Sequence, residues 1–164
     1  MSRPIKYKFW DREENVMLGP NLDPERYKIA SYNGLALIDM SRQDEDGYDY
    51  EMDVEFLRYT GLNDRNNKEI YEDSIVLITG EQELDYGLTF QWNEKAIVRW
   101  SDEECGFYLD VINKREVNLC QDGYFTVDTF SLRKWNDEEW WIEYEVIGNI
   151  YENPELIGGG AHVS

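Results

Sequence analysis

The residue types that most often carry out catalysis or hold metals are scarce in this chain. His162 is the only histidine, and it lies in a glycine-rich C-terminal segment. A histidine general base, nucleophilic triad or proton shuttle is therefore not expected in the folded body. Cys105 and Cys120 form no C-x-x-C motif, and no second pair completes a tetrahedral zinc site. Two reduced thiols, buried or half-buried, are expected, with a disulfide between strands as the alternative.

The densest acidic run, DEDGYDYEMD at residues 44–53, could in principle bind calcium. Asp44 and Asp46 fit positions 3 and 5 of an EF-hand loop, but position 1 would then be Arg42, which cannot ligate a cation. A solvated acidic loop with the edge of a strand is expected instead, with weak divalent-cation binding as the alternative. The acidic residues that we take as candidate interaction residues are Asp44, Asp46, Asp49 and Asp53.

None of the remaining motifs indicates an enzyme. The chain has 35 Asp and Glu residues, so some carboxylate pair will always lie at the spacing used by glycosidases. Gly158–Gly160 follows no strand-to-helix context and does not resemble a phosphate-binding loop. We therefore assign no catalytic, cofactor-binding or metal-binding residues, expect no cofactor, and expect that the protein is not an enzyme.

Trp140 and Trp141 are a second candidate for interaction. They follow three acidic residues in a segment that alternates like a strand, so their side chains should face opposite sides. Packing of both in the core is the leading interpretation. The alternative is that one of them is an exposed anchor for a protein partner, a role in which Trp is common.

The charge balance limits the partners. The formal net charge is −19, which argues against binding to nucleic-acid backbones and to anionic membranes, and permits basic partners. Aromatic residues make up 15% of the chain, which is typical of a folded protein. The average density is about one net charge per 450 Å² of surface, roughly fourfold below that of duplex DNA. Mimicry of DNA would require the acids of 44–53 and 101–104 to share one face.

Short apolar alternations separated by turns predict a β protein of the sandwich or barrel kind. Asn33-Gly34 between two apolar runs is a strong hairpin signal, and NLDPE at residues 21–25 predicts a turn or a short helix start. Residues 80–91 are expected to form a long polar connection. The expected strands are 6–10, two within 26–40, 56–60, 74–79, 96–100, 106–111, 123–127, 130–132 and 141–151.

No stretch approaches the about 18 apolar residues of a membrane span. The start, MSRPIKYKFW, has no apolar region followed by a cleavage site, so no signal peptide is expected. A cytoplasmic protein without membrane contact is therefore expected.

Three segments together resemble one protein family. PIKYKFWD, YTGLNDRNNKEIYEDSIV and YEVIGNIYENPEL look like the YopX family of phage and prophage proteins, and AIVRWSDEECGFYL is similar to the family segment between the last two. Two departures stand out: Asn66-Asn67 replaces the usual Asn-Gly, and Glu72-Asp73-Ser74 replaces the usual Glu-Gly-Asp. Asn tolerates a positive φ at modest cost, so both departures are compatible with the family fold.

The resemblance implies a mainly β fold with few short helices. We expect an N-terminal β region at 1–60, a small SH3-like barrel at 61–157 and a flexible tail at 158–164. No catalytic residues are established for the family. The leading hypothesis is an acidic phage or prophage accessory protein of uncharacterised function that binds a host or phage protein and is not an enzyme. The alternatives are a DNA mimic that inhibits a host nucleic-acid enzyme and, third, nucleic-acid binding through the barrel. Pairing into a homo-oligomer is a further option.

Overall fold

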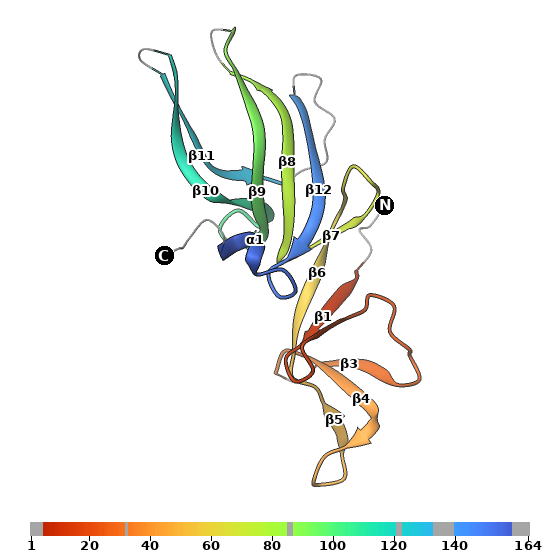
Figure 1. Ribbon diagram of the computed structural model, residues 1–164. Coiled ribbons are helices and arrows are strands. Elements are labelled where there is room, and N and C mark those ends of the chain that lie inside the picture. The colour runs from red at the N-terminus through yellow and green to blue at the C-terminus, as the bar shows by residue number, and fades with distance from the viewer. Residues whose placement is uncertain (1–4, 32, 85–86, 121–122, 133–139, 159–164) are drawn as a thin grey trace. The chain divides into compact units, whose positions relative to one another are not determined.

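The computed structural model describes residues 5–31, 33–84, 87–120, 123–132 and 140–158, with only the backbone of 119–120 and 140–141 (Figure 1). The chain divides into two compact units, Met1–Tyr59 and Thr60–Ser164. The fold is mainly β, as predicted, with one short helix among the described residues. No helix in the described part is long and apolar enough to cross a membrane.

The first unit contains two small antiparallel sheets. One belongs to a four-stranded sheet of order β2-β1-β6-β7. In it β1 (Tyr7–Asp11) pairs with β2 (Val16–Leu18) and with β6 (Val54–Asn63), which continues into the second unit, where β7 (Glu69–Tyr71) lies. The other has the order β3-β4-β5 and consists of β3 (Tyr27–Ser31), β4 (Leu35–Gln43) and β5 (Asp49–Glu51). Phe9, Leu37 and Met52 form the buried core of this unit.

Turn chemistry explains the connections of this unit. The hairpin predicted at Asn33-Gly34 is confirmed: Ser31 lies opposite Leu35, and Gly34 has a φ of 109°, which suits glycine. Residues 24–26 form a turn and no helix. The Asp23 carboxylate accepts a hydrogen bond from the Glu25 backbone N–H (2.9 Å), which stabilises this turn without starting a helix.

The second unit is built on one curled antiparallel sheet of five strands, in the order β11-β10-β9-β8-β12 (Figure 1). This arrangement is consistent with the expected SH3-like barrel. The elements of this unit are β7 (Glu69–Tyr71), β8 (Ser74–Glu83), β9 (Thr89–Ser101), β10 (Gly106–Cys120), β11 (Gly123–Ser131), β12 (Trp140–Asn149) and α1 (Glu155–Gly158).

An aromatic cluster fills the curl of this sheet. Phe90 and Trp92 are buried on one face of β9, with their ring centroids 5.1 Å apart in an edge-to-face arrangement. Trp92 also contacts Phe130 of β11, at 5.3 Å between centroids. Edge-to-face contacts of this kind stabilise a core beyond the burial of apolar area alone. The cluster therefore holds the two sides of the curl together.

The prediction of a long polar connection over 80–91 was wrong. β8 and β9 remain paired up to Glu83 and Thr89, so most of this segment is a long hairpin. Polar residues alternate with Phe90 and Trp92 along β9 and lie on the exposed face of the strand. The segment is therefore polar on average, and this led to the prediction of a loop. β10 and β11 are likewise longer than predicted, and their pairing shifts register between Asp110 and Arg115.

Asp64 stabilises the turn between β6 and β7. Its buried carboxylate accepts backbone hydrogen bonds from Asn66 (2.8 Å), Lys68 (2.9 Å) and, across the unit, Val146 of β12 (2.8 Å). Burial alone would raise the pKa of Asp64, but these three donors outweigh burial and lower it. One carboxylate therefore joins the β6–β7 turn to β12.

Asp73 has a similar role at the turn between β7 and β8. It adopts a φ of 63°, and its carboxylate accepts a hydrogen bond from the Tyr151 hydroxyl (2.7 Å). Its carbonyl accepts a hydrogen bond from the Ile150 N–H (3.0 Å). Burial raises the pKa of Asp73 despite the Tyr151 bond. The segment after β12 is thus attached to the start of the sheet.

Candidate functional site

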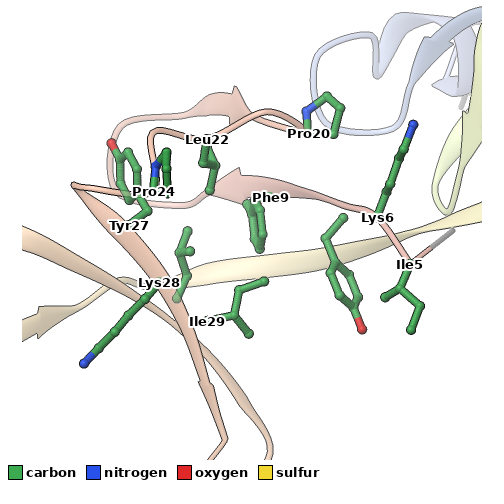
Figure 2. Close-up of a pocket in the computed structure, with 11 residues that line it drawn as sticks. Ile5, Lys6, Phe9, Pro20, Leu22, Pro24, Tyr27, Lys28 and Ile29 are labelled. Atoms are coloured by element: carbon green, nitrogen blue, oxygen red, sulfur yellow. The ribbon is translucent and has the colours of Figure 1, made fainter.

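A pocket of about 310 Å³ opens in the first unit (Figure 2). Its walls come from four segments that are separate in the sequence: residues 5–9 at the start of β1, the connection between β2 and β3, β3 itself, and β4, which contributes Leu37. The residues that shape it most are Tyr7, Phe9, Pro20, Leu22, Tyr27 and Ile29. It is small for a ligand pocket, near the lower end of the range of about 300–1,000 Å³.

Strand geometry gives the pocket its apolar lining. Tyr7 and Phe9 are two residues apart on β1, so they share a face of the strand. Phe9 is 2% exposed, belongs to the core of the unit and forms the back of the pocket. Ile29 at the rim is 48% exposed and Ile5 is 82% exposed. An apolar surface of this kind that stays exposed to solvent is typical of a site that binds another molecule.

Two lysines flank this apolar lining. Figure 2 shows the ammonium groups of Lys6 and Lys28 extending from opposite ends of the pocket. The Lys6 ammonium lies 5.5 Å from the centroid of the Tyr59 ring. Within the described residues, Lys28 has no ion-pair partner. Residues 1–59 carry 8 basic and 13 acidic residues, a net charge of −5, whereas 60–164 carry 8 and 22, a net charge of −14.

Asp39 on β4 supports the wall that Tyr27 forms. Its carboxylate is fully buried and accepts hydrogen bonds from Arg26 (3.1 and 3.2 Å) and Arg42 (3.1 Å). The Ser41 hydroxyl donates a further bond of 2.6 Å. The bond from Arg26 is the main reason that the pKa of Asp39 lies well below its usual range. Arg26 lies 4.8 Å from the Tyr27 ring centroid, so the buried charge network reaches the pocket wall.

The same network extends away from the pocket. The Arg42 guanidinium lies 4.0 Å from the centroid of the Tyr50 ring, and the Tyr50 hydroxyl donates a hydrogen bond to Glu13. That bond raises the pKa of Tyr50. Arg42, which makes an EF-hand impossible in the sequence, is therefore a structural residue of the first unit.

The four acidic candidates have different surroundings. Asp44 accepts backbone hydrogen bonds from Asp46 (2.9 Å) and Tyr48 (3.0 Å), which closes the turn between β4 and β5. Asp53 pairs with Arg12 at 2.7 Å. Asp46 and Asp49 are exposed on the turn and at the start of β5. Residues 44–53 and 101–104, which DNA mimicry would bring together, belong to different units.

The tryptophan candidates are placed only by their backbone. Trp140 and Trp141 begin β12 and lie opposite Gln82 and Glu81 of β8, but their side chains fall outside the described part of the chain. His162 and the expected tail after Gly158 also lie outside the described residues.

The described residues contain no cluster of three or more His, Cys, Asp or Glu side chains able to hold a metal ion. Cys105 is a free thiol in the turn after β9. It is exposed, so the expectation that it would be buried or half-buried was wrong; the side chain of Cys120 is not among those described. Glu94, 8% exposed, forms an ion pair with Arg115 next to the register shift of β10. Their hydrogen bond raises the pKa of Arg115. The Glu94 carboxylate therefore has a structural role as the partner of Arg115.

Sequence reasoning missed the pocket because no single segment contains it. Leu22 lies in a short stretch with Pro20 and Pro24, which by itself reads only as a turn. The one available signal was an apolar residue between two prolines, where a fully solvated loop would have a polar residue. The sequence also did not indicate that Tyr48, near Asp46 in the turn between β4 and β5, is an exposed aromatic side chain (72% exposed).

The match to a known family comes from nearly the whole chain. The profile of the family described as "YopX protein" matches residues 6–158. The chain belongs to the YopX family. No curated protein matches the chain. A solved structure, protein EF1440 from Enterococcus faecalis, is similar to this YopX chain at 21% identity and a TM-score of 0.45, covering 96% of this chain and 100% of that one.

Proposed function

We propose that this YopX protein is a non-enzymatic accessory protein that acts by binding another protein through the pocket of its first unit. The observation that supports this most is the apolar lining around Phe9 with Ile29 exposed at its rim. A host or phage protein is the partner that family membership favours. Direct binding of nucleic acid is disfavoured by the net charge of −19.

The experiment is capture of partners from host lysate at low and high salt with the wild type and two variants. Ile29→Asp places a carboxylate at the pocket rim. Leu35→Asp is the matched control, because Leu35 is 49% exposed on the same hairpin but does not line the pocket. We expect a partner that binds the wild type and Leu35→Asp at both salt concentrations and is lost with Ile29→Asp.

Two results would contradict this function. A partner that binds all three proteins equally would place the contact elsewhere on the chain. If that partner were a basic nucleic-acid enzyme released by high salt, the DNA-mimic alternative would be favoured, since screening weakens contacts between exposed charges. Turnover of a nucleotide or nucleic acid that is lost on one carboxylate substitution would show an enzyme instead.

A further inference from the structure

β3, which forms one wall of the pocket, is an edge strand. In the sheet order β3-β4-β5 it pairs only with β4 over the described residues. An edge strand offers backbone N–H and C=O groups with which another extended chain can pair. β3 contains no proline and no register shift that would block such pairing. The Tyr27 N–H at its start is already donated to the Asp23 carbonyl (2.9 Å), so the edge is open from Ile29 onward.

The register shows which backbone groups of β3 point outward. The Arg26 carbonyl accepts a hydrogen bond from the Met40 N–H (2.6 Å), and bonded pairs then alternate along an antiparallel ladder. The Ile29–Leu37 pair is therefore not hydrogen bonded. In agreement, the Leu37 carbonyl accepts its hydrogen bond from Met52 on the opposite side of β4 (2.9 Å). The N–H and C=O of Ile29 thus face the outer edge, while its side chain lines the pocket.

We propose that an extended peptide segment of the partner adds to the outer edge of β3, inserts one apolar side chain into the pocket and places carboxylates beside Lys28 and Lys6. This inference rests on the proposed function and specifies the partner segment. Main-chain pairing at an edge supplies affinity, and a pocket for alternate side chains supplies specificity. Here Ile29 provides both, because its backbone lies at the edge and its side chain at the rim.

Charge complementarity determines the chemistry of the segment. The two lysines extend from opposite ends of an apolar pocket. They attract carboxylates at short range, whereas the net charge of −19 repels them over longer distances that salt screens. Lys28 lies between Tyr27 and Ile29 on β3, so its side chain leaves the opposite face of the strand from Ile29. Acidic residues of an added strand should therefore lie an odd number of positions from the apolar anchor, on both sides of it. A basic segment would lose this attraction to the lysines.

The first test uses two labelled nine-residue peptides and fluorescence anisotropy with the full chain. Both have a central leucine with alternating threonines, and they differ only in carrying aspartate or lysine at the second and eighth positions. We expect the aspartate peptide to bind at least tenfold more tightly at about 0.15 M salt, where the long-range repulsion from the net charge is screened, and N-methylation of its alternate amides to weaken it at least tenfold. Equal binding of both peptides, or binding of neither at millimolar concentration, would overturn the proposal.

Charge reversal tests the role of the lysines. Lys28→Glu should weaken the aspartate peptide at least fivefold and strengthen the lysine peptide. Lys95→Glu is the matched control, because Lys95 is an exposed lysine on a strand of the second unit and should change neither affinity. Identical effects of the two variants would show only the influence of overall charge, and would contradict a contact at Lys28.

Proline substitution tests the edge. Ile29→Pro removes an N–H that β4 does not use, so the hairpin should persist, since proline is tolerated on the solvent side of edge strands. Ile29→Ala shortens the side chain but keeps the N–H. We expect Ile29→Pro to weaken the aspartate peptide at least fivefold more than Ile29→Ala does, with a far-ultraviolet circular dichroism spectrum like that of the wild type. Equal effects would show that strand addition does not occur.

These results separate the two proposals. If the partner captured from lysate is lost with Ile29→Asp but retained with Ile29→Pro and Lys28→Glu, the pocket binds a protein without strand addition, and only the further inference fails. If the partner is retained with all three variants, the proposed function at this pocket fails as well.

Discussion

At the scale of single residues, side chains at turns explain where this chain departs from its family. Asn67 and Asp73 occupy the two positions at which the resemblance to the family leads us to expect glycine, and both have positive φ, 64° and 63°. Each has a side-chain hydrogen bond in compensation, from Asn63 to Asn67 (2.9 Å) and from Tyr151 to Asp73 (2.7 Å). The side-chain hydrogen bonds of Asn67 and Asp73 therefore offset the strain of a positive φ, which a glycine at either position would not have.

Asn67 gives the first prediction. Asn67→Gly should stabilise the second unit by about 0.5 to 1 kcal/mol, because glycine adopts this φ without strain and the lost hydrogen bond is exposed. The measurement is urea unfolding followed by circular dichroism. Asn67→Ala is the control and should destabilise by about 1 kcal/mol, since alanine has the strain and no compensating bond. Equal stability of both variants would show that strain at this turn is negligible.

Asp39 gives a prediction on pH. Its pKa is lowered in the folded state, so its contribution to stability is fully present above the unfolded pKa of about 3.9 and is lost as the pH falls further. Asp39→Asn should destabilise the first unit by about 3 kcal/mol at neutral pH, because it leaves two arginines without their buried carboxylate. Amide hydrogen exchange of β4 at pH 5 to 7 measures this loss.

The acid range provides the control for Asp39. Below about pH 4 the difference between wild type and Asp39→Asn should shrink, because the Asp39 carboxylate takes up a proton in the unfolded chain, which favours unfolding of the wild type. Urea unfolding at pH 3 and pH 7 compares the two proteins. A difference that is the same at both pH values would show that Asp39 acts through packing and not through its charge.

At the scale of elements, the sequence predicted strands whose turns are local and missed those that depend on tertiary pairing. The β3–β4 hairpin was predictable because Asn33-Gly34 itself favours the turn. The β8–β9 hairpin was not, because its exposed polar face hides the alternation with Phe90 and Trp92. The pocket was not predictable either, because β1, β3, β4 and the connection between β2 and β3 form it only after folding.

The bulge in β12 gives a prediction at this scale. The pairing of β12 with β8 shifts register between Val146 and Gly148, and a Cβ on Gly148 would lie 2.4 Å from the Asn153 side-chain oxygen and 3.0 Å from the Asn153 Cβ. Gly148→Ala should therefore destabilise the second unit by about 1 to 3 kcal/mol, as overpacking does. Thermal unfolding of the variant and wild type measures the loss.

A double-mutant cycle tests the cause. Asn153→Gly removes the clashing atoms, so adding Gly148→Ala to that background should cost much less than in the wild type. Asn153→Gly alone has its own cost, because the Asn153 side chain accepts a hydrogen bond from the Asn149 N–H (3.2 Å). Additive effects of the two substitutions would show that the loss arises from the backbone of the bulge and not from the contact.

At the scale of the whole molecule, charge is divided unevenly between the two units. Residues 60–164 carry a net charge of −14 and residues 1–59 only −5. In the first unit, ion pairs at Asp39 and between Arg12 and Asp53 offset part of the repulsion. The two units should therefore respond differently to salt, since screening weakens both self-repulsion and exposed ion pairs.

The last prediction follows from that division. Raising sodium chloride from 10 mM to 500 mM should increase the protection of amides in β8 and β9 against hydrogen exchange, because excess negative charge opposes folding of the second unit at low salt. Amides in β3 and β4 should gain less protection, because the first unit has less excess charge to screen and the pairs of Arg26 and Arg42 with the buried Asp39 are little affected by salt. Hydrogen exchange read by mass spectrometry resolves both regions in one sample, so protein concentration and pH are matched. An equal gain in both would mean that total charge governs stability. A larger gain in the second unit would show that each unit responds to its own net charge. Repulsion of an acidic partner would then be weaker at the first unit, where Lys6 and Lys28 lie at the pocket.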